Sequence, residues 1–378
     1  MNPSEAARLL SEYLRIDSTN PPGDTTACVE WLRAQLAASG IESTILGFDA
    51  EAPSLVATVG DGDEALVLHH HMDVVPVDGQ DWTVAPFAGE IIDGYIYGRG
   101  ALDMKGFGIL CLLTLNEVAQ RSGDLRRPLR FLATSDEEVG GTRGAAFLSS
   151  NHLPETGGAF LWTEGSFATI AGGEVTYPIQ TAETGVAAIE LTATGRPGHA
   201  SMDNAENPVT RLVGAVERIV RAKLAFKPTP TVLNAGGSFN VVPAVATCTF
   251  DIRVPPGVTQ EQVIAQLLDS AGRPLWLSAE VARWSDPTFS PEDSQLMTAM
   301  ENAIRSERPE AEITTVQGRI GTDARPYRGQ GVVCYGLVPF ELDENELKGM
   351  HGTDERVSIE NLERGLRIMR RVVETLCL

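Results

Sequence analysis

The chain has 378 residues, of which 43% are hydrophobic, and its formal net charge is −21. This length exceeds what one hydrophobic core usually supports, so two domains are expected, and the negative charge argues against nucleic acid and anionic membrane as partners. No apolar run reaches the roughly 18 residues of a membrane span and no signal-like apolar region follows Met1, so we expect a cytoplasmic protein.

Helices and strands alternate along the first part of the chain. Periodic apolar residues predict helices at residues 3–16, 25–38 and 105–119. Apolar runs predict strands at residues 42–46, 54–59, 65–71, 129–134 and 158–162, and a hairpin at 89–97 that turns at Asp93-Gly94. Because the later strands are nearly all apolar, this alternation predicts a three-layer α/β domain.

Residues 180–291 have a different pattern, with the order β-α-β-β-α-β. Its strands are predicted at residues 186–193, 231–233, 245–254 and 276–283, and its helices at 208–223 and 259–271. This order matches the ferredoxin-like motif, so we expect a small inserted α+β domain. The helices at 294–306 and 359–376 and the strands at 312–316 and 332–337 then complete the first domain, which comprises residues 1–179 and 292–378.

Polar side chains follow several predicted strands where those strands end. His71 and Asp73 follow one apolar run, Glu137-Glu138 follows a second and Glu164 a third. A single strand end of this kind is most simply a solvated loop. Open α/β sheets, however, bind ligands at the carboxyl ends of their strands, so the repetition indicates one shared site.

Alternation along the strand 65–71 separates its three histidines. His69 and His71, with Asp73, are predicted to point to one face of the sheet and His70 to the other. This spacing places the carboxylate of Asp73 close enough to orient the imidazole of His71, an arrangement typical of histidines that bind a metal.

Five residues are candidate metal ligands: His71, Asp103, Glu138, Glu164 and His351. Two histidines and three carboxylates suit zinc, cobalt or manganese, and they divide into two sites of three ligands if one carboxylate bridges. His351 lies in a polar loop, K-G-M-H-G-T-D-E-R, where a role in core packing is hard to argue. The five cysteines lack paired spacing, so a cysteine-based zinc site is not expected.

The sequence resembles the co-catalytic zinc aminoacylase and carboxypeptidase family, which includes acetylornithine deacetylase, succinyl-diaminopimelate desuccinylase, glutamate carboxypeptidase and carnosinase-like dipeptidases. The matching stretches are H-M-D-V-V-P, G-R-G-A-L-D-M-K-G, S-D-E-E-V-G-G, W-T-E-G, G-R-P-G-H-A-S, F-N-V-V-P and M-H-G-T-D-E-R, in the family's order. The resemblance implies a catalytic domain with a mixed, mostly parallel, phosphorylase/hydrolase-like sheet and an inserted lid and dimerisation domain.

The resemblance also implies two divalent metal ions, most simply zinc, held by two sets of ligands: His71, Asp103 and Glu164, and Asp103, Glu138 and His351. Asp103 would bridge the two ions. Glu137 would be the general base, taking a proton from a water that the ions share and passing it to the leaving amine. Spacing alone does not decide whether Glu137 or Glu138 is the ligand.

Further site residues are implied outside the metal set. His199 resembles an oxyanion-stabilising histidine that reaches the partner subunit's site in dimeric relatives, although by spacing alone it is a turn residue. Asn240 and Arg253 match positions that bind the substrate's carboxylate or backbone. Arg325, in the stretch G-T-D-A-R, is a weaker candidate of this kind, as is Gly321-Thr322-Asp323 before it. Arg253 could equally be a surface residue at a strand edge.

Together these features predict a homodimeric metallohydrolase that cleaves an amide bond in a small substrate with a free carboxylate. Carboxypeptidase- or dipeptidase-like cleavage of short peptides is the leading prediction, because residues 81–100 resemble the peptidase-like branch of the family. The alternative is an N-acyl-amino-acid deacylase of the acetylornithine or succinyl-diaminopimelate type. A non-catalytic binding protein with the same fold is a third hypothesis, disfavoured because all five candidate ligands and Glu137 are present.

Overall fold

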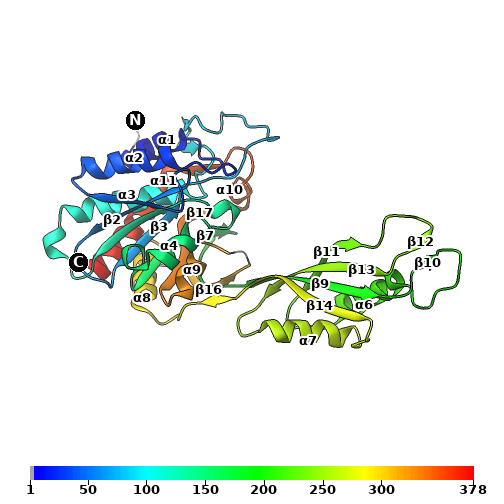
Figure 1. The fold of residues 1–378 in the computed structure, drawn as a ribbon. Helices are drawn as coiled ribbons and strands as arrows, with labels where there is room; N and C mark the ends of the chain where they lie inside the picture. Colours follow the sequence, from blue (N-terminus) through cyan, green and yellow to red (C-terminus); the bar gives the residue numbers. More distant parts are fainter. Residues whose placement is uncertain (1–3, 320) are drawn as a thin grey trace. The chain divides into compact units, whose positions relative to one another are not determined.

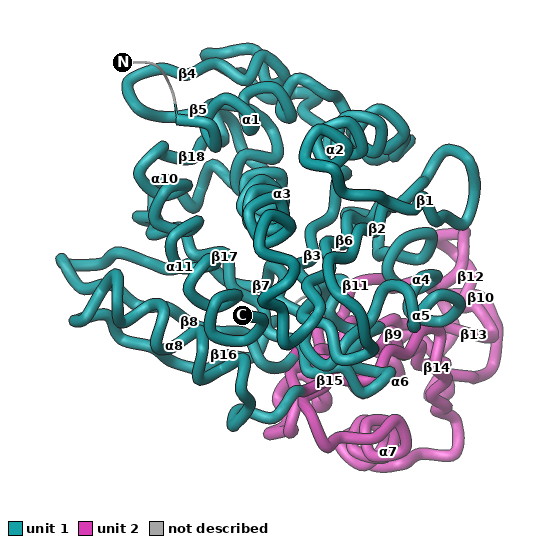
Figure 2. The backbone as a smooth tube through the Cα atoms, turned by 90° about the vertical axis from the view of Figure 1, so that its left-hand side faces the viewer, with its two compact units in different colours: residues 1–182, 290–378 teal, residues 183–289 magenta. Residues whose placement is uncertain are grey.

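The computed structural model describes residues 4–319 and 321–378, which divide into two compact units (Figures 1 and 2). Unit 1 consists of residues 1–182 and 290–378, and unit 2 of residues 183–289. Unit 2 is therefore inserted between the two chain segments of unit 1. Among the helices of the described residues, none combines the length and apolar character needed to cross a membrane.

Unit 1 contains a large sheet, a small sheet and helices. Its helices are α1 (Glu5–Leu14), α2 (Thr26–Ala38), α3 (Lys105–Ala119), α4 (Ala145–Asn151), α5 (Leu153–Thr156), α8 (Gln295–Glu307), α9 (Ala324–Gly329), α10 (Glu344–Leu347) and α11 (Ile359–Cys377). Its strands are β1 (Ser43–Gly47), β2 (Pro53–Val59), β3 (Leu66–His71), β4 (Ile91–Ile92), β5 (Tyr95–Tyr97), β6 (Leu129–Thr134), β7 (Phe160–Ala171), β8 (Glu174–Glu183), β16 (Glu312–Gly318), β17 (Val333–Leu342) and β18 (Arg356–Ser358). Short 3₁₀ turns occupy Ser122–Asp124 and Glu137–Val139.

The large sheet has the strand order β1-β2-β6-β3-β7-β17-β8, and β16 also pairs with β8. Its centre is parallel, since β3 runs parallel to β6 and β7, and β7 to β17, whereas β2 is antiparallel to β1 and β6. The register places His71 opposite Thr134, so β3 and β6 end together. The predicted mixed, mostly parallel sheet is therefore confirmed, and its strand ends meet at one edge.

Helices cover both faces of this sheet. On β3, Leu66 and Leu68 pack in the core formed with α1, α2, α3, α8 and α11, whereas Val67 packs in a second core with α4 and α9. His70 continues the first set, because its Nε2 lies 3.2 Å from the hydroxyl of Tyr13 on α1. The predicted three layers and the predicted opposite orientation of His70 are thus confirmed.

A small sheet, β18-β5-β4, joins two distant parts of the chain in unit 1 (Figure 2). The predicted hairpin forms through Asp93 and Gly94, with φ of +49° and +83°, the left-handed values of a tight hairpin turn. β18 pairs with β5, placing Arg356 opposite Tyr97. The loop that follows β5 therefore begins beside the end of the loop that precedes β18.

Unit 2 is an antiparallel sheet with two helices. Its elements are β9 (Gly185–Thr194), β10 (Gly198–His199), α6 (Pro208–Arg221), β11 (Pro228–Asn234), β12 (Val241–Val242), β13 (Val245–Val254), α7 (Gln260–Ser270), β14 (Leu277–Ser285) and β15 (Thr288–Phe289). The sheet order is β11-β13-β9-β14, and α6 and α7 contribute to its core. This is the predicted ferredoxin-like arrangement.

The structure corrects one predicted strand end. Glu164 was expected just beyond a strand that ends at Trp162, but β7 continues through it to Ala171 and forms a hairpin with β8. The strand is irregular here, because Gly165 has a φ of +151° and the pairing with β17 shifts register after Gly336. Burial also decreases from Thr163 to Glu164, so the strand leaves the core at the site.

Candidate functional site

Asp103 lies between two histidines that are far apart in the sequence. His71 is the last residue of β3, Asp103 lies in the loop between β5 and α3, and His351 lies in the loop between α10 and β18. Oδ1 of Asp103 is 3.0 Å from Nε2 of His71, and Oδ2 is 2.9 Å from Nε2 of His351. Each carboxylate oxygen thus faces a different imidazole.

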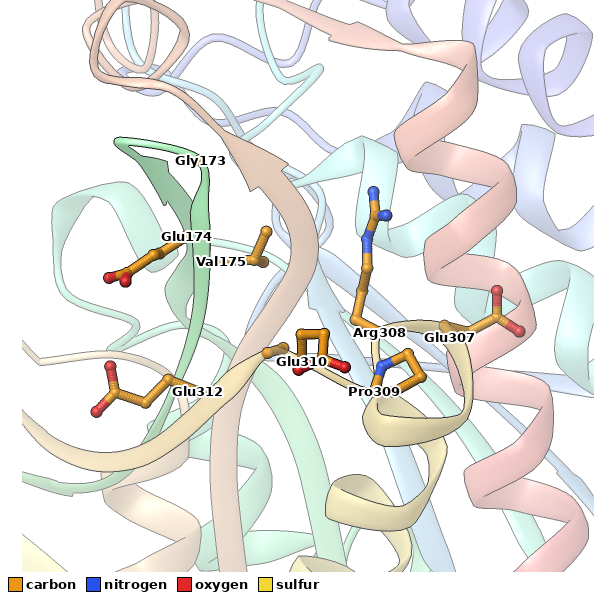
Figure 3. A pocket seen from close by; sticks show the side chains of 9 residues that line it. Gly173, Glu174, Val175, Glu307, Arg308, Pro309, Glu310 and Glu312 are labelled. Atoms are coloured by element: carbon orange, nitrogen blue, oxygen red, sulfur yellow. The ribbon is translucent and has the colours of Figure 1, made fainter.

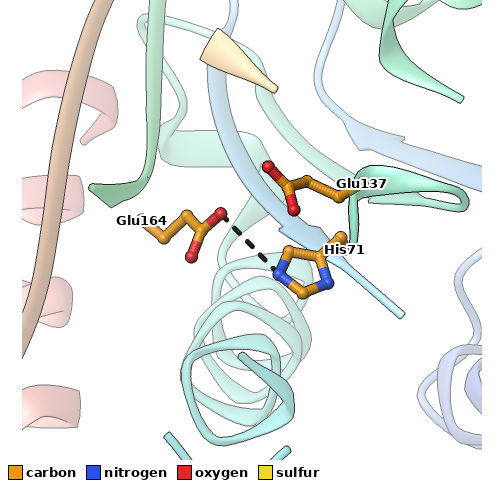
Figure 4. A group of neighbouring side chains, drawn as sticks. All are labelled: His71, Glu137 and Glu164. Atoms are coloured by element: carbon orange, nitrogen blue, oxygen red, sulfur yellow. Dashed lines mark ion pairs between the residues drawn. The ribbon is translucent and has the colours of Figure 1, made fainter. Parts of the chain in front are cut away.

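Two glutamates extend this arrangement on either side. Oε1 of Glu164 is 3.7 Å from Nε2 of His71 (Figure 4), and Oε2 of Glu138 is 3.5 Å from Nε2 of His351. The structure therefore brings all five candidate ligands together. Their contacts form two groups that share Asp103, with His71 and Glu164 on one side and His351 and Glu138 on the other.

Glu137 lies beside the first group. Figure 4 shows its carboxylate facing His71 and Glu164, and single ligand atoms from these three residues lie within 4.8 Å of one another. Atoms of His71, Asp103 and Glu138 satisfy the same limit. Geometry alone therefore admits Glu137 either as a ligand or as a neighbouring base.

The electrostatics of the cluster favour bound cations. Burial raises the pKa of Glu137, Glu138 and Glu164, and neighbouring carboxylates raise it further. Hydrogen bonds with Asp103 and Glu138 raise the pKa of His351 to about 10. Oε1 of Glu138 is buried and has no hydrogen-bond partner among the described residues. Crowded, partly unsatisfied carboxylates beside imidazoles are a donor set that fits divalent metal ions.

The backbone, rather than the side chain, of Asp73 accepts the shortest hydrogen bond from His71. Nδ1 of His71 is 2.9 Å from the carbonyl oxygen of Asp73 and 3.6 Å from Oδ1. The carboxylate instead accepts hydrogen bonds from the backbone N–H groups of Glu137 and Glu138, at 3.2 and 3.1 Å, and from Asn20 at 2.8 Å. With Nδ1 donating to the carbonyl, the lone pair of Nε2 points into the cluster.

A buried chain of hydrogen-bonded polar side chains, a connection that sequence reasoning missed, links His69 to Asp323. Nδ1 of His69 is 2.6 Å from Oγ1 of Thr163, and its Nε2 is 2.9 Å from Oγ1 of Thr134. Thr134 also donates to Oδ2 of Asp323 at 2.6 Å, and the charge of Asp323 contributes to the raised pKa of Glu137. Asp323 was a weak candidate for binding substrate, and its contact with Thr134 was not foreseen.

Three predicted site residues lie in unit 2. The pairing of β10 with β12 places His199 opposite Val241, next to Asn240, whose carbonyl accepts a hydrogen bond from Ala200 N–H at 3.0 Å. β13 begins at Val245, three residues after β12, and Arg253 lies near its other end. The rise per residue of a strand separates Val245 from Arg253 by about 26 Å. The guanidinium of Arg253 contacts Asp251 at 3.2 Å. Within this unit, His199 and Asn240 are neighbours and Arg253 is apart from them.

The imidazole of His199 contacts Ser201 in the same loop. Its Nδ1 lies 2.8 Å from Oγ of Ser201 and 3.3 Å from the backbone nitrogen of the same residue, so the contacts with Ser201 are made by Nδ1. The remaining predicted residue, Arg325, is the second residue of α9 and follows Asp323 by two positions. It therefore belongs to the segment that contacts the buried polar chain.

A separate hollow of about 600 Å³ lies at the β7–β8 turn and the turn from α8 to β16 (Figure 3). Its lining residues are Gly173, Glu174, Val175, Glu307, Arg308, Pro309, Glu310, Ala311 and Glu312. The guanidinium of Arg308 donates to both carboxylate oxygens of Glu341 at 2.8 Å. Because this cation is already engaged and no predicted site residue lines the hollow, we assign it no function.

A sheet with a parallel centre that carries this donor set at its carboxyl edge is the framework of a metallohydrolase. The chain belongs to peptidase family M20/M25/M40, whose family model matches residues 67–375. It is thus a hydrolase that acts on amide bonds, as predicted.

Two curated relatives and one solved structure illustrate the similarity. The chain is 30% identical to succinyl-diaminopimelate desuccinylase of Methylobacterium radiotolerans over 98% of this chain and 97% of the relative. It is 27% identical to aminoacylase-1 of Sus scrofa over 97% and 94%. An M20 family metallo-carboxypeptidase from Sulfolobus solfataricus matches with a TM-score of 0.73 at 17% identity and covers 99% of both chains, which supports the fold.

Proposed function

We propose that this hydrolase uses two metal ions to cleave the amide bond of a small substrate with a free carboxylate. The observation that carries the proposal is the position of Asp103, whose two oxygens face the imidazoles of His71 and His351 at 3.0 and 2.9 Å. A carboxylate shared in this way suits a bridge between two cations.

The proposed ligands are His71, Asp103 and Glu164 for one ion, and Asp103, Glu138 and His351 for the other. Zinc is the proposed metal, with cobalt or manganese as alternatives. Two such cations would acidify a water shared between them and polarise the amide carbonyl.

Glu137 is the proposed general base. It takes the proton of the attacking water and later delivers it to the nitrogen that leaves. Asp73 supports this task by accepting the backbone N–H groups of Glu137 and Glu138, which fixes the turn that carries both side chains.

Substrate recognition is proposed for the residues outside the cluster. His199 would donate a ring N–H to the developing oxyanion, through Nε2 if Nδ1 stays engaged with Ser201. Asn240, Arg253 and Arg325 would bind the substrate's carboxylate or backbone, a task for which guanidinium groups are well suited.

The substrate is proposed to be either a short peptide or an N-acyl amino acid. The resemblance of residues 81–100 to the peptidase-like branch supports the first. The desuccinylase and aminoacylase-1, at 30% and 27% identity, support the second more directly than a 17% identical carboxypeptidase supports the first. Both reactions need the same metal centre and base, so substrate choice is a separate question from mechanism.

Hydrolysis of one panel by the zinc-loaded chain is the test of this function. The panel contains dipeptides, N-acetyl amino acids and N-succinyl-diaminopimelate, and a chelated sample is the control. We expect cleavage that chelation abolishes and that zinc restores. Preference for one N-acyl amino acid would establish the deacylase form, and cleavage of several dipeptides the peptidase form. A chain that binds no metal and cleaves nothing would contradict the proposal and favour a binding protein.

We further propose a homodimer formed through unit 2. β11 is an edge strand of its sheet, with Val232 and Leu233 each 57% exposed, and α6 exposes Val213 and Val220. An apolar edge strand is a ready surface for pairing with a second copy. Light scattering should give twice the chain mass of 40.5 kDa, and Leu233→Glu should shift the protein toward the single-chain mass. A wild-type protein of single-chain mass would contradict the dimer and any site completed by the partner subunit.

A further inference from the structure

Glu355 is a fully buried carboxylate in the loop just before β18. Its Oε1 accepts hydrogen bonds from the backbone N–H groups of Leu102 at 2.8 Å and Asp103 at 3.2 Å. Its Oε2 accepts hydrogen bonds from Nη1 of Arg99 at 2.6 Å and from the N–H of Gly100 at 3.2 Å. One side chain thus fixes the backbone of the loop that carries Asp103.

Arg99 extends this support to the loop that carries His351. Its Nη2 donates to the carbonyl oxygen of Gly352 at 3.1 Å and to Oε1 of Gln80 at 2.8 Å. Nε2 of Gln80 in turn donates to the carbonyl oxygen of His351 at 3.0 Å. Because Glu355 and Arg99 are 0% and 1% exposed, water does not replace these hydrogen bonds when one partner is removed.

The loop that carries His351 depends on such support. The φ of His351 is +57° and that of Asp354 is +55°, in the left-handed region that residues other than glycine adopt at a cost. Backbone of this kind keeps its shape only where the surroundings hold it. Oδ1 of Asp354 accepts a hydrogen bond from the N–H of Thr83 at 2.8 Å, which adds one further tie.

We propose that Glu355 is the positioning residue of the metal centre: acting with Arg99 and Gln80, it holds Asp103 and His351 at the spacing that two cations require. This inference rests on the proposed function, since it gives a task at the metal centre to a carboxylate outside the ligand set. Glu355 accepts a hydrogen bond from the backbone N–H of Asp103. Because Asp103 is the ligand proposed for both ions, Glu355 affects the binding of both. Gln80 donates directly to the carbonyl oxygen of His351 but reaches Asp103 only through Arg99 and Glu355, so it acts mainly on the ion that His351 would hold.

Glu355→Gln isolates this role because it preserves the size of the side chain. Each oxygen of Glu355 accepts two hydrogen bonds, so whichever way the amide is turned, its NH₂ group faces two N–H donors. Two of the four hydrogen bonds are lost, and the loop that carries Asp103 must move.

Glu341→Gln is the matched control for the loss of a buried carboxylate. Glu341 is 3% exposed and also accepts four hydrogen bonds, from Tyr177, Arg308 and Arg364. Its partners all lie outside the metal cluster. Both substitutions should lower the melting temperature, but Glu341→Gln should leave zinc affinity at the wild-type value.

The test is an equilibrium titration of the metal-free full chain with Zn²⁺ in competition with a chromophoric chelator. For Glu355→Gln we expect affinity for both ions to fall by about 10- to 100-fold, the usual effect of removing a group that orients ligands. For Gln80→Ala, which changes a partly exposed side chain, we expect one binding step to weaken by about tenfold and the other to weaken less, because Gln80 reaches Asp103 only through Arg99 and Glu355.

Wild-type zinc affinity in a folded Glu355→Gln protein would overturn the inference. If that variant does not fold, Gln80→Ala decides, and two unchanged binding steps would overturn it equally. A wild-type chain that binds no zinc would instead overturn the proposed function, and the titration reveals this before any variant is compared.

Discussion

Glu137→Gln is expected to lower kcat by about 10²- to 10⁴-fold while the protein keeps its fold and both metal ions. The amide has nearly the same size as the carboxylate but cannot take a proton from water. Each tenfold loss corresponds to about 1.4 kcal/mol of the activation barrier, so the expected loss is about 3 to 5 kcal/mol. The measurement is kcat for the best substrate of the panel, together with the zinc content of the purified variant.

Glu138→Gln is the control for this prediction, because it alters the neighbouring carboxylate. If Glu138 is the ligand, its variant should lose one of two zinc ions and lose activity for that reason. The two variants then differ in metal content although their substitutions are adjacent. Loss of zinc from Glu137→Gln and retention in Glu138→Gln would reverse the two assignments, and full activity in Glu137→Gln would refute the general base.

The sequence predicts best those parts of the fold where local pattern and burial agree. The leucine-rich segment at residues 105–119 was predicted to be a helix, and the structure gives α3 the same bounds. The opposite orientations of His70 and His71 follow from strand alternation alone. The carboxyl edge of the sheet could be located because several strands end in titratable residues there.

Some of the missed elements contain residues that oppose their conformation. β8 carries Pro178 in its interior, and proline argues against a strand because it cannot donate a ladder hydrogen bond. α9 spans six residues and includes Pro326, so it is too short for a helical period to be visible. β7 was predicted too short because Gly165 interrupts its apolar run, whereas its pairing with the distant β17 continues.

The site is harder to predict wherever it depends on contacts between distant residues. Arg99 and Glu355 are separated by 256 positions, and each lies in a matching stretch that was noted only for its ligand. Spacing also favoured the carboxylate of Asp73 as the partner of His71, but the chain turns so that the carbonyl of the same residue is nearer. The roles proposed for His199, Asn240 and Arg253 stay predictions.

Asp103→Asn is expected to abolish binding of both metal ions, with affinity at least about 10²-fold weaker for each and activity lost with them. The reason is geometric, because each oxygen of Asp103 faces a different histidine and an amide presents only one oxygen. The substitution also removes the negative charge that would reduce the repulsion between the two cations, so the ion that keeps the oxygen binds more weakly as well. Zinc content after dialysis and the equilibrium titration both measure the effect.

Substitution of the ligands on either side of Asp103 tests whether Asp103 bridges two ions or binds only one. Glu164→Gln should weaken one zinc ion and His351→Ala the other, because Glu164 is 3.7 Å from Nε2 of His71 whereas His351 pairs with Asp103 and Glu138. Asp103→Asn alone should then weaken both. If Asp103→Asn retains one zinc ion at wild-type affinity, Asp103 serves a single ion. The two halves of the cluster would then be independent sites, and no water held between two cations would be available to Glu137.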